Sequence, residues 1–436
     1  MSRFAVWRRH RVRVVVVAVA VALVVGAVIA SFAIARERPA TPSQAQAPAN
    51  EAQATALAYA ECMREHDITD FPDPTFESDG GVLFEGRRGL AASEDQLRAA
   101  DEACGGRLPV AGASAGQSSD GPADVDWERI EPGGDCRCAD GSDYAFFARK
   151  ADPEKIVLYL DGGGACWSAP TCRPGGDNEY QRSIEEPNAE GVFAFSDQRN
   201  PFADYSVVYV PYCTADLHIG NAATRYAPDL TVQHKGLVNG TAALDYLAKN
   251  FPDATEVVVL GSSAGALTAP LYAALVSDRL PDAHITSIAD SAGGYGDVPT
   301  LDAILTGGAW GATRALPEWV EEFSVPDFYV QSARHNPDIL FARYDHAYDR
   351  DQLTHLELVG APTDDLRAVI DANEAAIENA GVDVHSFTAP GERHVAFAED
   401  AFYSENVGGI ALSDWVDELV AGTPAADVHC TACRSG

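Results

Sequence analysis

The sequence predicts an α/β fold in which a mostly parallel sheet is flanked by helices. From residue 126 onwards, short β-branched runs alternate with longer helix-forming segments, a pattern typical of strands joined by helical crossovers. The chain has 436 residues, of which 46% are hydrophobic and 22% charged, enough for one large globular domain with attachments. The predicted strands are residues 155–160, 206–211, 256–261, 284–289, 338–343 and 382–387, and the predicted helices are residues 236–251, 265–278, 364–380 and 412–422.

An apolar segment, residues 14–35, precedes this domain and is flanked on its N-terminal side by several arginines. It is long enough to cross a bilayer core of about 30 Å, and the arginines orient its N-terminus towards the cytoplasm. Residues 33–35 also resemble a signal-peptidase site. We therefore expect either a single-pass protein of the cell membrane with its main domain outside, or a secreted protein if the segment is cleaved.

Changes in amino-acid composition along the sequence predict the boundaries between its segments. A small helical module, interrupted by the sequence FPDP, is predicted between two flexible linkers rich in small and polar residues. The predicted boundaries are 1–13 for a basic cytoplasmic segment, 14–35 for the transmembrane anchor or signal, 36–50 for a linker, 51–110 for the module, 111–125 for a second linker, 126–422 for the α/β domain and 423–436 for a cysteine-containing tail.

The nine cysteines fit an extracellular location, where disulfides persist. Cys62 and Cys104 lie in the two halves of the small module, and a bridge between them would join helices too short to build a core. Cys430 and Cys433 form a single CxxC pair at the chain end, for which a structural disulfide is expected rather than a metal site. No metal and no cofactor are predicted.

The charge excludes some partners. The net charge is −34, and only four residues are lysine, at positions 150, 155, 235 and 249. A nucleic-acid partner is excluded, because phosphate backbones require a cationic surface. A polyanionic substrate would also be repelled by the overall field of the protein.

The segment VVVLGSSAGALTAPLY, residues 257–272, carries the main functional signal. Residues 261–265 fit G-x-S-x-G between a predicted strand and a predicted helix, which is the context of a nucleophile elbow. Glycine at both flanking positions removes the collisions that side chains would make in so tight a turn. Ser263 is therefore predicted to be a nucleophile in an α/β-hydrolase-like domain. The alternative is a small-residue turn without chemistry.

A nucleophilic serine needs a histidine base and an acid, in the chain order Ser, acid, His. Of the eleven histidines, His394 remains, because it lies in a loop after the last predicted strand. The other histidines precede the acid loop, lie too close to it, or lie in the tail, in a strand or near the N-terminus. The acid stays open among Asp345, Asp349 and Asp351, which follow the preceding strand, and Asp290.

An oxyanion hole needs backbone N–H groups near the nucleophile. One is expected from Ala264, which follows Ser263, and others from the loop YLDGGGACW at residues 159–167. Its glycines allow close approach to a substrate carbonyl. A phosphate-binding loop is excluded, because no GK[ST] follows.

Three blocks of sequence carry a family resemblance. CADGSDYAFFARKADPEKIVLYLDGGGACWSAPTC, NPFADYSVVYVPYCTADLHIGN and GSSAGA occur in this order, and they resemble the pectin acetylesterase family, which includes the Notum carboxylesterases. The resemblance runs from about Cys138 to His394. It implies a serine esterase of the α/β-hydrolase type that needs no metal.

The resemblance also implies particular residue roles. Ser263 would be the nucleophile, Asp349 the acid and His394 the base. The implied oxyanion hole is Gly163, Gly164 and Ala264, and the implied disulfides are Cys166–Cys172, Cys138–Cys213 and one bridge among Cys136, Cys430 and Cys433.

Two departures from the Notum branch favour a short acyl group such as acetyl. Notum carries a tryptophan where this chain has Gly164, and no extended apolar lid is evident. We therefore expect an extracellular, monomeric serine carboxylesterase that removes O-acetyl groups from a polysaccharide or acts on a similar small acyl ester. Trp167, His218 and Asn221 are candidate substrate contacts. The alternatives are a lipase or fatty-acyl deacylase of the Notum type, and a non-catalytic cell-surface binding protein.

Overall fold

The computed structural model divides the chain into two compact units, residues 1–119 and 120–436, which are described separately. The predicted segment 14–35 and both predicted linkers lie outside the described residues. Among the residues that are described, no helix has the length and apolar character needed to cross a membrane. The structure describes residues 57–64, 66, 68, 69, 71, 74–76, 82, 83 and 104, and residues 127–434 except 176, 177, 179, 297, 423 and 424.

The first unit contains a helix at residues 57–64 and a short antiparallel pair, β1 (Thr75–Phe76) with β2 (Val82–Leu83). The disulfide between Cys62 and Cys104 is present, as the spacing predicted. It lies in a small buried cluster with aromatic and aliphatic side chains of the same unit. The second helix predicted in this module lies outside the described residues, apart from Cys104.

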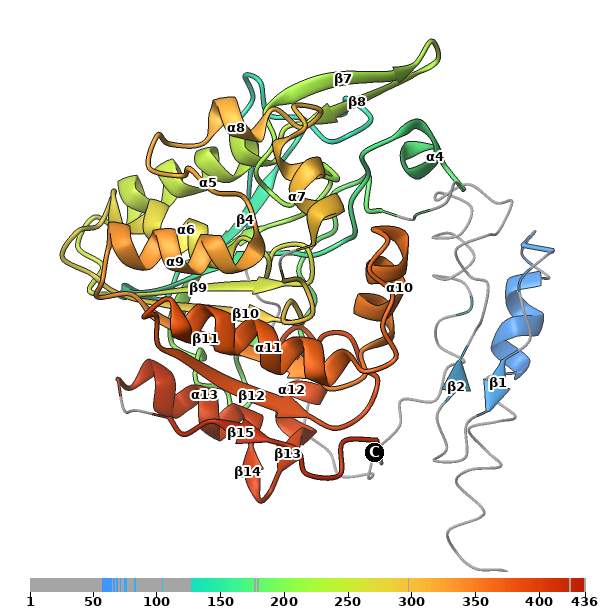
Figure 1. Ribbon diagram of the computed structural model, residues 1–436. Helices are drawn as coiled ribbons and strands as arrows, with labels where there is room; N and C mark the ends of the chain where they lie inside the picture. The colour runs from blue at the N-terminus through green and yellow to red at the C-terminus, as the bar shows by residue number, and fades with distance from the viewer. Residues whose placement is uncertain are drawn as a thin grey trace, which may run out of the picture. The chain divides into compact units, whose positions relative to one another are not determined.

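The second unit is built on a nine-stranded sheet with the order β15-β12-β11-β10-β9-β5-β6-β4-β3 (Figure 1). All neighbours from β15 to β6 are parallel, whereas β4 and β3 continue antiparallel at one edge. Every strand predicted from the sequence lies in the parallel part. The bounds are β3 (Glu128–Ile130), β4 (Phe146–Arg149), β5 (Asp152–Leu160), β6 (Tyr205–Val210), β9 (Glu256–Ser262), β10 (His284–Asp290), β11 (Leu340–His346), β12 (Val384–Ala389) and β15 (Val428–His429).

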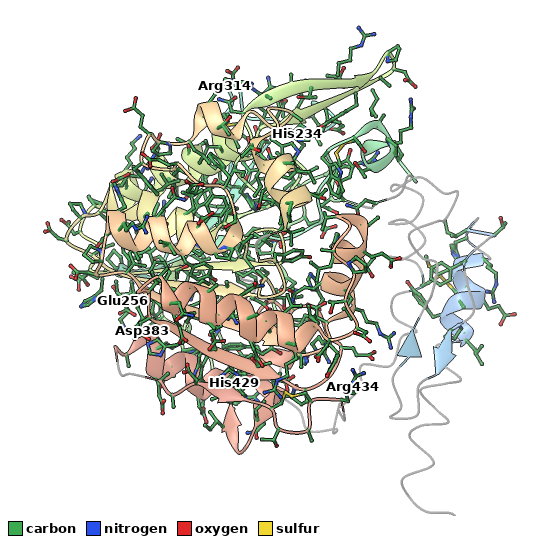
Figure 2. The ribbon with its side chains drawn as sticks, in the orientation of Figure 1. His234, Glu256, Arg314, Asp383, His429 and Arg434 are labelled. Atoms are coloured by element: carbon green, nitrogen blue, oxygen red, sulfur yellow. A yellow bond between two sulfur atoms is a disulfide. The ribbon has the colours of Figure 1, made fainter. Side chains whose placement is uncertain are left out.

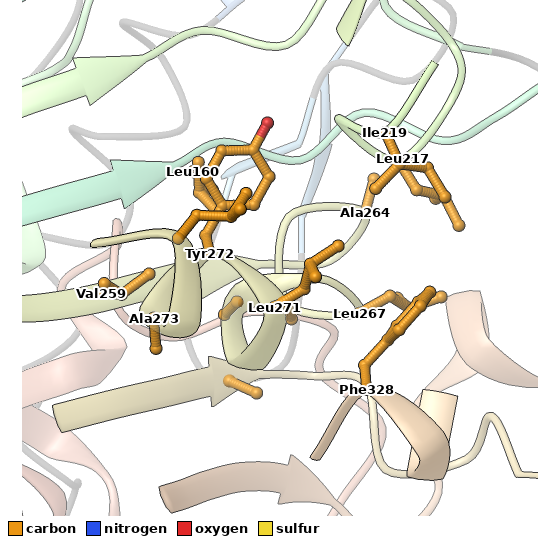
Figure 3. Close-up of a cluster of buried hydrophobic side chains, with 14 of the residues drawn as sticks. Leu160, Leu217, Ile219, Val259, Ala264, Leu267, Leu271, Tyr272, Ala273 and Phe328 are labelled. Atoms are coloured by element: carbon orange, nitrogen blue, oxygen red, sulfur yellow. The ribbon is translucent and has the colours of Figure 1, made fainter. Parts of the chain in front are cut away.

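The parallel strands are buried on both faces, because alternate residues enter two separate cores. In β9, Val257 and Val259 belong to one core, and Val258 and Leu260 belong to the other. The first core packs under helices α5, α6, α9 and α11, part of it drawn in Figure 3, and the second packs under α12 and α13. A strand covered on both faces reads as a continuous apolar run, which is why these strands could be predicted.

The four predicted helices are present as α5, α6, α11 and α13. Helix α6 begins at Ala269, later than predicted, because the chain first passes through a turn at residues 263–268. The long helices and the connecting ones are α5 (Gly236–Asn250), α6 (Ala269–Ser277), α7 (Pro299–Thr306), α9 (Val325–His335), α10 (Arg350–Leu358), α11 (Leu366–Asn379) and α13 (Leu412–Val420), with short helices α4 (Ala169–Cys172), α8 (Ala312–Ala315), α12 (Ala401–Ser404) and the 3-10 turn η3 (Gly191–Phe193).

Two short antiparallel pairs project from this frame. One is β13 (Asn406–Val407) with β14 (Ile410–Ala411), and the other is the hairpin of β7 (Ala222–Ala227) and β8 (Leu230–His234). The buried His234, labelled in Figure 2, ends the larger hairpin and holds it through two hydrogen bonds. Its Nδ1–H donates to the carbonyl of Thr214, and the hydroxyl of Tyr226 donates to Nε2.

The second unit contains the disulfides Cys138–Cys213, Cys166–Cys172 and Cys430–Cys433. Cys136 is buried and remains outside any disulfide. Residues 423–436, predicted as a separate tail, contribute β15 to the edge of the sheet beside β12. Cys430 follows this strand directly, and its N–H donates to the carbonyl of Thr388.

Candidate active site

The candidate site lies at one edge of the parallel sheet. The carboxyl ends of parallel strands meet at the same edge, and ligands bind outside it. Ser263 directly follows β9, and the glycine-rich loop follows the neighbouring strand β5. Asp349 and His394 follow β11 and β12, which are also neighbours. The topology thus brings together residues that are far apart in the sequence.

Ser263 occupies the tight turn that the motif predicted. Its φ angle is 51°, a left-handed conformation that a non-glycine residue adopts at a cost. A Cβ atom on Gly261 would lie 2.4 Å from the carbonyl oxygen of Gly265, and a Cβ on Gly265 would lie 2.2 Å from that of Leu160. Both flanking glycines are therefore required by the space available.

A continuous hydrogen-bond chain links the three candidate catalytic residues. Nε2 of His394 lies 2.7 Å from Oγ of Ser263, and Nδ1 lies 2.7 Å from Oδ2 of Asp349. Because a carboxylate can only accept, Nδ1 carries the proton and Nε2 presents its lone pair to the serine hydroxyl. This tautomer is the one that removes a proton from a nucleophilic serine.

The Asp349 carboxylate is fully buried, and both of its oxygens accept hydrogen bonds. It caps the N-terminus of α10, with Oδ1 accepting from the backbone N–H groups of Asp351 and Gln352. Its Oδ2 accepts from the side-chain amide of Gln352 as well as from His394. These donors stabilise the charged form of the acid and fix its orientation.

Asp290, an alternative acid in the sequence, has a different role in the structure. Its carboxylate accepts from Oγ of Ser262 and from the backbone N–H groups of Ala396 and Phe397. These last two residues follow His394 in its loop, so Asp290 ties the histidine loop to the elbow and does not bond the imidazole ring. Burial raises the pKa of Asp290 to about 6.

The remaining candidates also point elsewhere. Oδ1 of Asp345 accepts from the backbone N–H of Gly293 and from the side chain of Gln352. Asp351 lies exposed in the first turn of α10. Within the described part of the chain, Asp349 is the aspartate that hydrogen-bonds the His394 ring.

The surroundings of His394 predict the pH dependence of activity. Burial alone would lower the pKa of His394, but the hydrogen bond and charge of Asp349, with Asp351 and Asp290 further away, raise it above its ordinary value of 6.5. Only the neutral imidazole accepts the proton of Ser263, so kcat/KM should fall on acidification with a midpoint above 6.5. Initial rates on p-nitrophenyl acetate across neutral pH, read at the isosbestic wavelength, test this. A midpoint below that value would contradict the pairing with Asp349.

The glycine-rich loop after β5 supplies backbone N–H groups beside the serine. Gly163 and Gly164 have φ angles of 146° and 72°, which favour glycine. The N–H groups of Gly163, Gly164 and Ala264 donate to no residue that the structure describes. Buried N–H groups are normally paired, so this concentration of unpaired donors next to Ser263 suits a developing oxyanion.

Residues behind the loop fix its path. The Asp161 carboxylate accepts from the N–H of Gly162 and from the hydroxyl of Tyr209, and burial raises the pKa of Asp161 to about 6. Nε2–H of His218 donates to the carbonyl of Asp161. The disulfide Cys166–Cys172 closes the far end of the loop.

A cavity of about 50 Å³ opens beside Ser263. Of the candidate substrate contacts, Trp167 lines this cavity, and His218 and Asn221 do not. His218 is buried behind the loop, and the side chain of Asn221 accepts from Lys235. Sequence reasoning missed most of the other lining residues, among them Tyr295, Trp310 and His355, which no motif marks. The complete lining is Gly164, Ala165, Trp167, Leu217, Ser263, Ala264, Leu267, Tyr295, Leu301, Trp310, His355 and Val359.

One group of side chains in the described residues has the composition of a metal site, Cys62, His66 and Cys104. The two sulfurs are bonded to each other, so neither is a thiolate that could bind a metal. Nδ1–H of His66 donates to the carbonyl of Cys62. The group is therefore accounted for as a disulfide with a neighbouring histidine.

The strained serine turn at the carboxyl edge of a mostly parallel sheet defines an α/β-hydrolase fold. The crystal structure of the Wnt deacylase Notum from Drosophila shares this fold, with a TM-score of 0.50 and 17% sequence identity over 69% of this chain and 95% of that chain. Residues 126–305 match the family described as Pectinacetylesterase. The match, together with the relatives described below, assigns residues 126–305 to this family.

Curated relatives fall in both branches of the family. The palmitoleoyl-protein carboxylesterase NOTUM of Schmidtea mediterranea is 31% identical over 30% of this chain and 26% of its own length. Pectin acetylesterase 5 of Arabidopsis thaliana is 25% identical over 36% of this chain and 39% of its own length. The matched segments thus span between about a quarter and two fifths of these relatives.

Proposed function

We propose that this protein is an extracellular serine carboxylesterase that removes O-acetyl or similarly short acyl groups from a glycan or a small ester. The observation that carries the proposal is the hydrogen-bond chain from Ser263 through His394 to Asp349. Beside it lie backbone N–H groups that have no partner in the described part of the chain. Four disulfides and the basic, apolar N-terminal sequence support the extracellular location.

The proposed reaction proceeds in two halves. His394 accepts the proton of Ser263 as Oγ attacks the ester carbonyl, and Asp349 stabilises the imidazolium that forms. The carbonyl oxygen gains negative charge and is bound by N–H groups of the glycine-rich loop and Ala264. His394 then protonates the departing alcohol, which leaves an acyl group on Ser263. A water molecule attacks this acyl group, gives its proton to His394 and releases the carboxylic acid, and Ser263 regains its proton.

The size of the cavity supports a short acyl group. Its volume is about 50 Å³, well below the roughly 150 Å³ of an engineered cavity that takes up benzene. Its walls are large side chains such as Trp167 and Trp310. A long fatty chain would have to displace them or remain in water.

The acyl-length profile tests this proposal. We expect kcat/KM to be highest for p-nitrophenyl esters of two to four carbons and at least about tenfold lower for the octanoate, because the excess chain gains no burial. The Ser263→Ala variant, assayed on every ester, supplies the blank. A preference for octanoate would instead support a fatty-acyl deacylase.

The negative charge of the protein limits which glycans it can bind. The pectin acetylesterase relative suggests an acetylated polysaccharide, but a protein with a net charge of −34 repels a polyanion such as unesterified pectin. A neutral or weakly charged acetylated glycan fits the protein surface better.

A further inference from the structure

We propose that the cavity selects a short acyl group that carries a hydroxyl, recognised by Nε2 of His355 and the hydroxyl of Tyr295. The inference rests on the proposed esterase function and names the substrate class of the same site. It starts from two polar side chains in an otherwise apolar lining.

The hydrogen bonding of His355 makes its Nε2 an acceptor. Nδ1 lies 2.8 Å from the backbone carbonyl of Asp351, and because a carbonyl only accepts, Nδ1 carries the proton. Burial, and then the charge of His394, lower the pKa of His355 and keep its ring neutral. The Nε2 lone pair is thus available to a hydrogen-bond donor.

Among the described residues, none hydrogen-bonds Nε2 of His355 or the hydroxyl of Tyr295. The remaining walls are mainly aliphatic and indole carbon, including Leu217, Leu301 and Val359. Both residues line the cavity, and a polar group that is desolvated without a partner costs free energy, so a ligand hydroxyl that reaches them would be favoured over the plain acyl analogue.

The cavity holds the acyl side of the ester. It is bounded by Ser263, Gly164 and Ala264, the residues around which the acyl carbonyl must sit. At about 50 Å³ it is well below the roughly 150 Å³ of a cavity that takes up benzene, so a short acyl group suits it better than a sugar ring. None of the lining residues carries a carboxylate, which disfavours an aminoacyl group, because its ammonium would be buried unpaired.

His355 lies on α10, the helix that Asp349 caps. The same short helix therefore holds Asp349, which orients His394, and His355, which would hydrogen-bond the hydroxyl of the acyl group. A hydroxyl bound to His355 would fix the acyl carbonyl relative to the catalytic residues, so we expect the preference to appear in kcat as well as in KM.

The test compares matched ethyl esters in a pH-stat: lactate against propionate, and 3-hydroxybutyrate against butyrate. Each kcat/KM is divided by the rate constant for alkaline hydrolysis of the same ester. For at least one pair, the corrected ratio should be about 10 in favour of the hydroxyacyl ester, the value of one neutral hydrogen bond. His355→Leu should bring this ratio to about 1, because Leu provides no acceptor.

Further variants separate recognition from folding. His355→Gln keeps an acceptor oxygen and should retain part of the preference, while Tyr295→Phe should lower it. The control is Glu357→Leu, an exposed position on the same helix that does not line the cavity, which should leave the ratio unchanged. The ratio within each variant is the readout, so a general loss of activity does not imitate the effect.

The outcomes distinguish the two levels of proposal. Hydrolysis of butyrate that depends on Ser263, without preference for either hydroxyacyl ester, would overturn this inference and leave the esterase proposal standing. A preference that survives in His355→Leu would also overturn it. Absence of Ser263-dependent hydrolysis of all four esters would overturn the proposed function, and this inference with it.

Discussion

Replacement of Ser263 by alanine should lower kcat/KM for p-nitrophenyl acetate by about a thousandfold or more, to the level that oxyanion binding alone can sustain. The reason is geometric. Oγ of Ser263 is the hydroxyl that faces Nε2 of His394, and alanine removes the attacking atom without altering the strained turn. Because the two side chains differ by one oxygen, the thermal midpoint should change little.

The adjacent serine in the same motif is the matched control. Ser262 is buried, with its Oγ held between the hydroxyl of Tyr159 at 2.8 Å and the carboxylate of Asp290 at 2.9 Å. It cannot reach a substrate, so Ser262→Ala should cost about tenfold or less, through a weaker tie between the elbow and the histidine loop. Equal, low activity of the parent and both variants would favour the binding-protein alternative.

The fold was largely predictable because both faces of its central strands are covered. Continuous apolar runs marked β5, β6, β9, β10, β11 and β12 along the sequence. The edge strands left weaker signals. Strand β3 has the pattern exposed, exposed, half-buried, and β15 consists of only two residues, so neither carries enough apolar periodicity to be predicted.

The site was predictable where local geometry imposes a sequence pattern. The elbow has no space for a side chain at residues 261 and 265, and the motif G-x-S-x-G records glycine at these two positions. The acid has no such pattern: Asp290, Asp345 and Asp349 are all fully buried at the same edge of the sheet. Only the directions of their carboxylates distinguish them, and the family resemblance, not spacing, favoured Asp349.

The substrate contacts were the least predictable. His218 and Asn221 looked like pocket residues, but positive φ angles at Ala215, Leu217 and His218 turn the chain so that Leu217 enters the cavity lining and His218 points behind it. Such a reversal cannot be read from side-chain types. His355 was set aside as a base because it lies too close to the acid loop, and its helix α10, which places it in the cavity lining, was not predicted.

Asp349→Asn should reduce kcat by about ten-thousandfold while the protein remains folded. Asparagine caps helices as well as aspartate does, so its carbonyl oxygen should keep the bonds to the N–H groups of Asp351 and Gln352. The amide NH₂ then takes the place of Oδ2 and donates to Nδ1 of His394. The imidazole proton moves to Nε2, where it faces Ser263 and blocks proton removal.

Asp290→Asn is the control for this substitution, because Asp290 is equally buried and was an equally good acid in the sequence. It supports the backbone at Ala396 and Phe397, so we expect about a tenfold loss and a lower thermal midpoint. A greater loss of kcat in Asp290→Asn than in Asp349→Asn would move the acid role to Asp290.

The pH profile of the residual activity in Asp349→Asn separates an electrostatic role of Asp349 from a packing defect, because a packing defect would not shift the midpoint of this profile. The Asp349 charge opposes the effect of burial on His394 and raises the pKa of its imidazole. Without that charge burial dominates, so the midpoint for loss of activity on acidification should shift to lower pH. Asp290→Asn should move it less, because Asp290 has no hydrogen bond to the ring. A midpoint unchanged in Asp349→Asn would mean that the carboxylate beside His394 in the structure is not the group that sets its protonation.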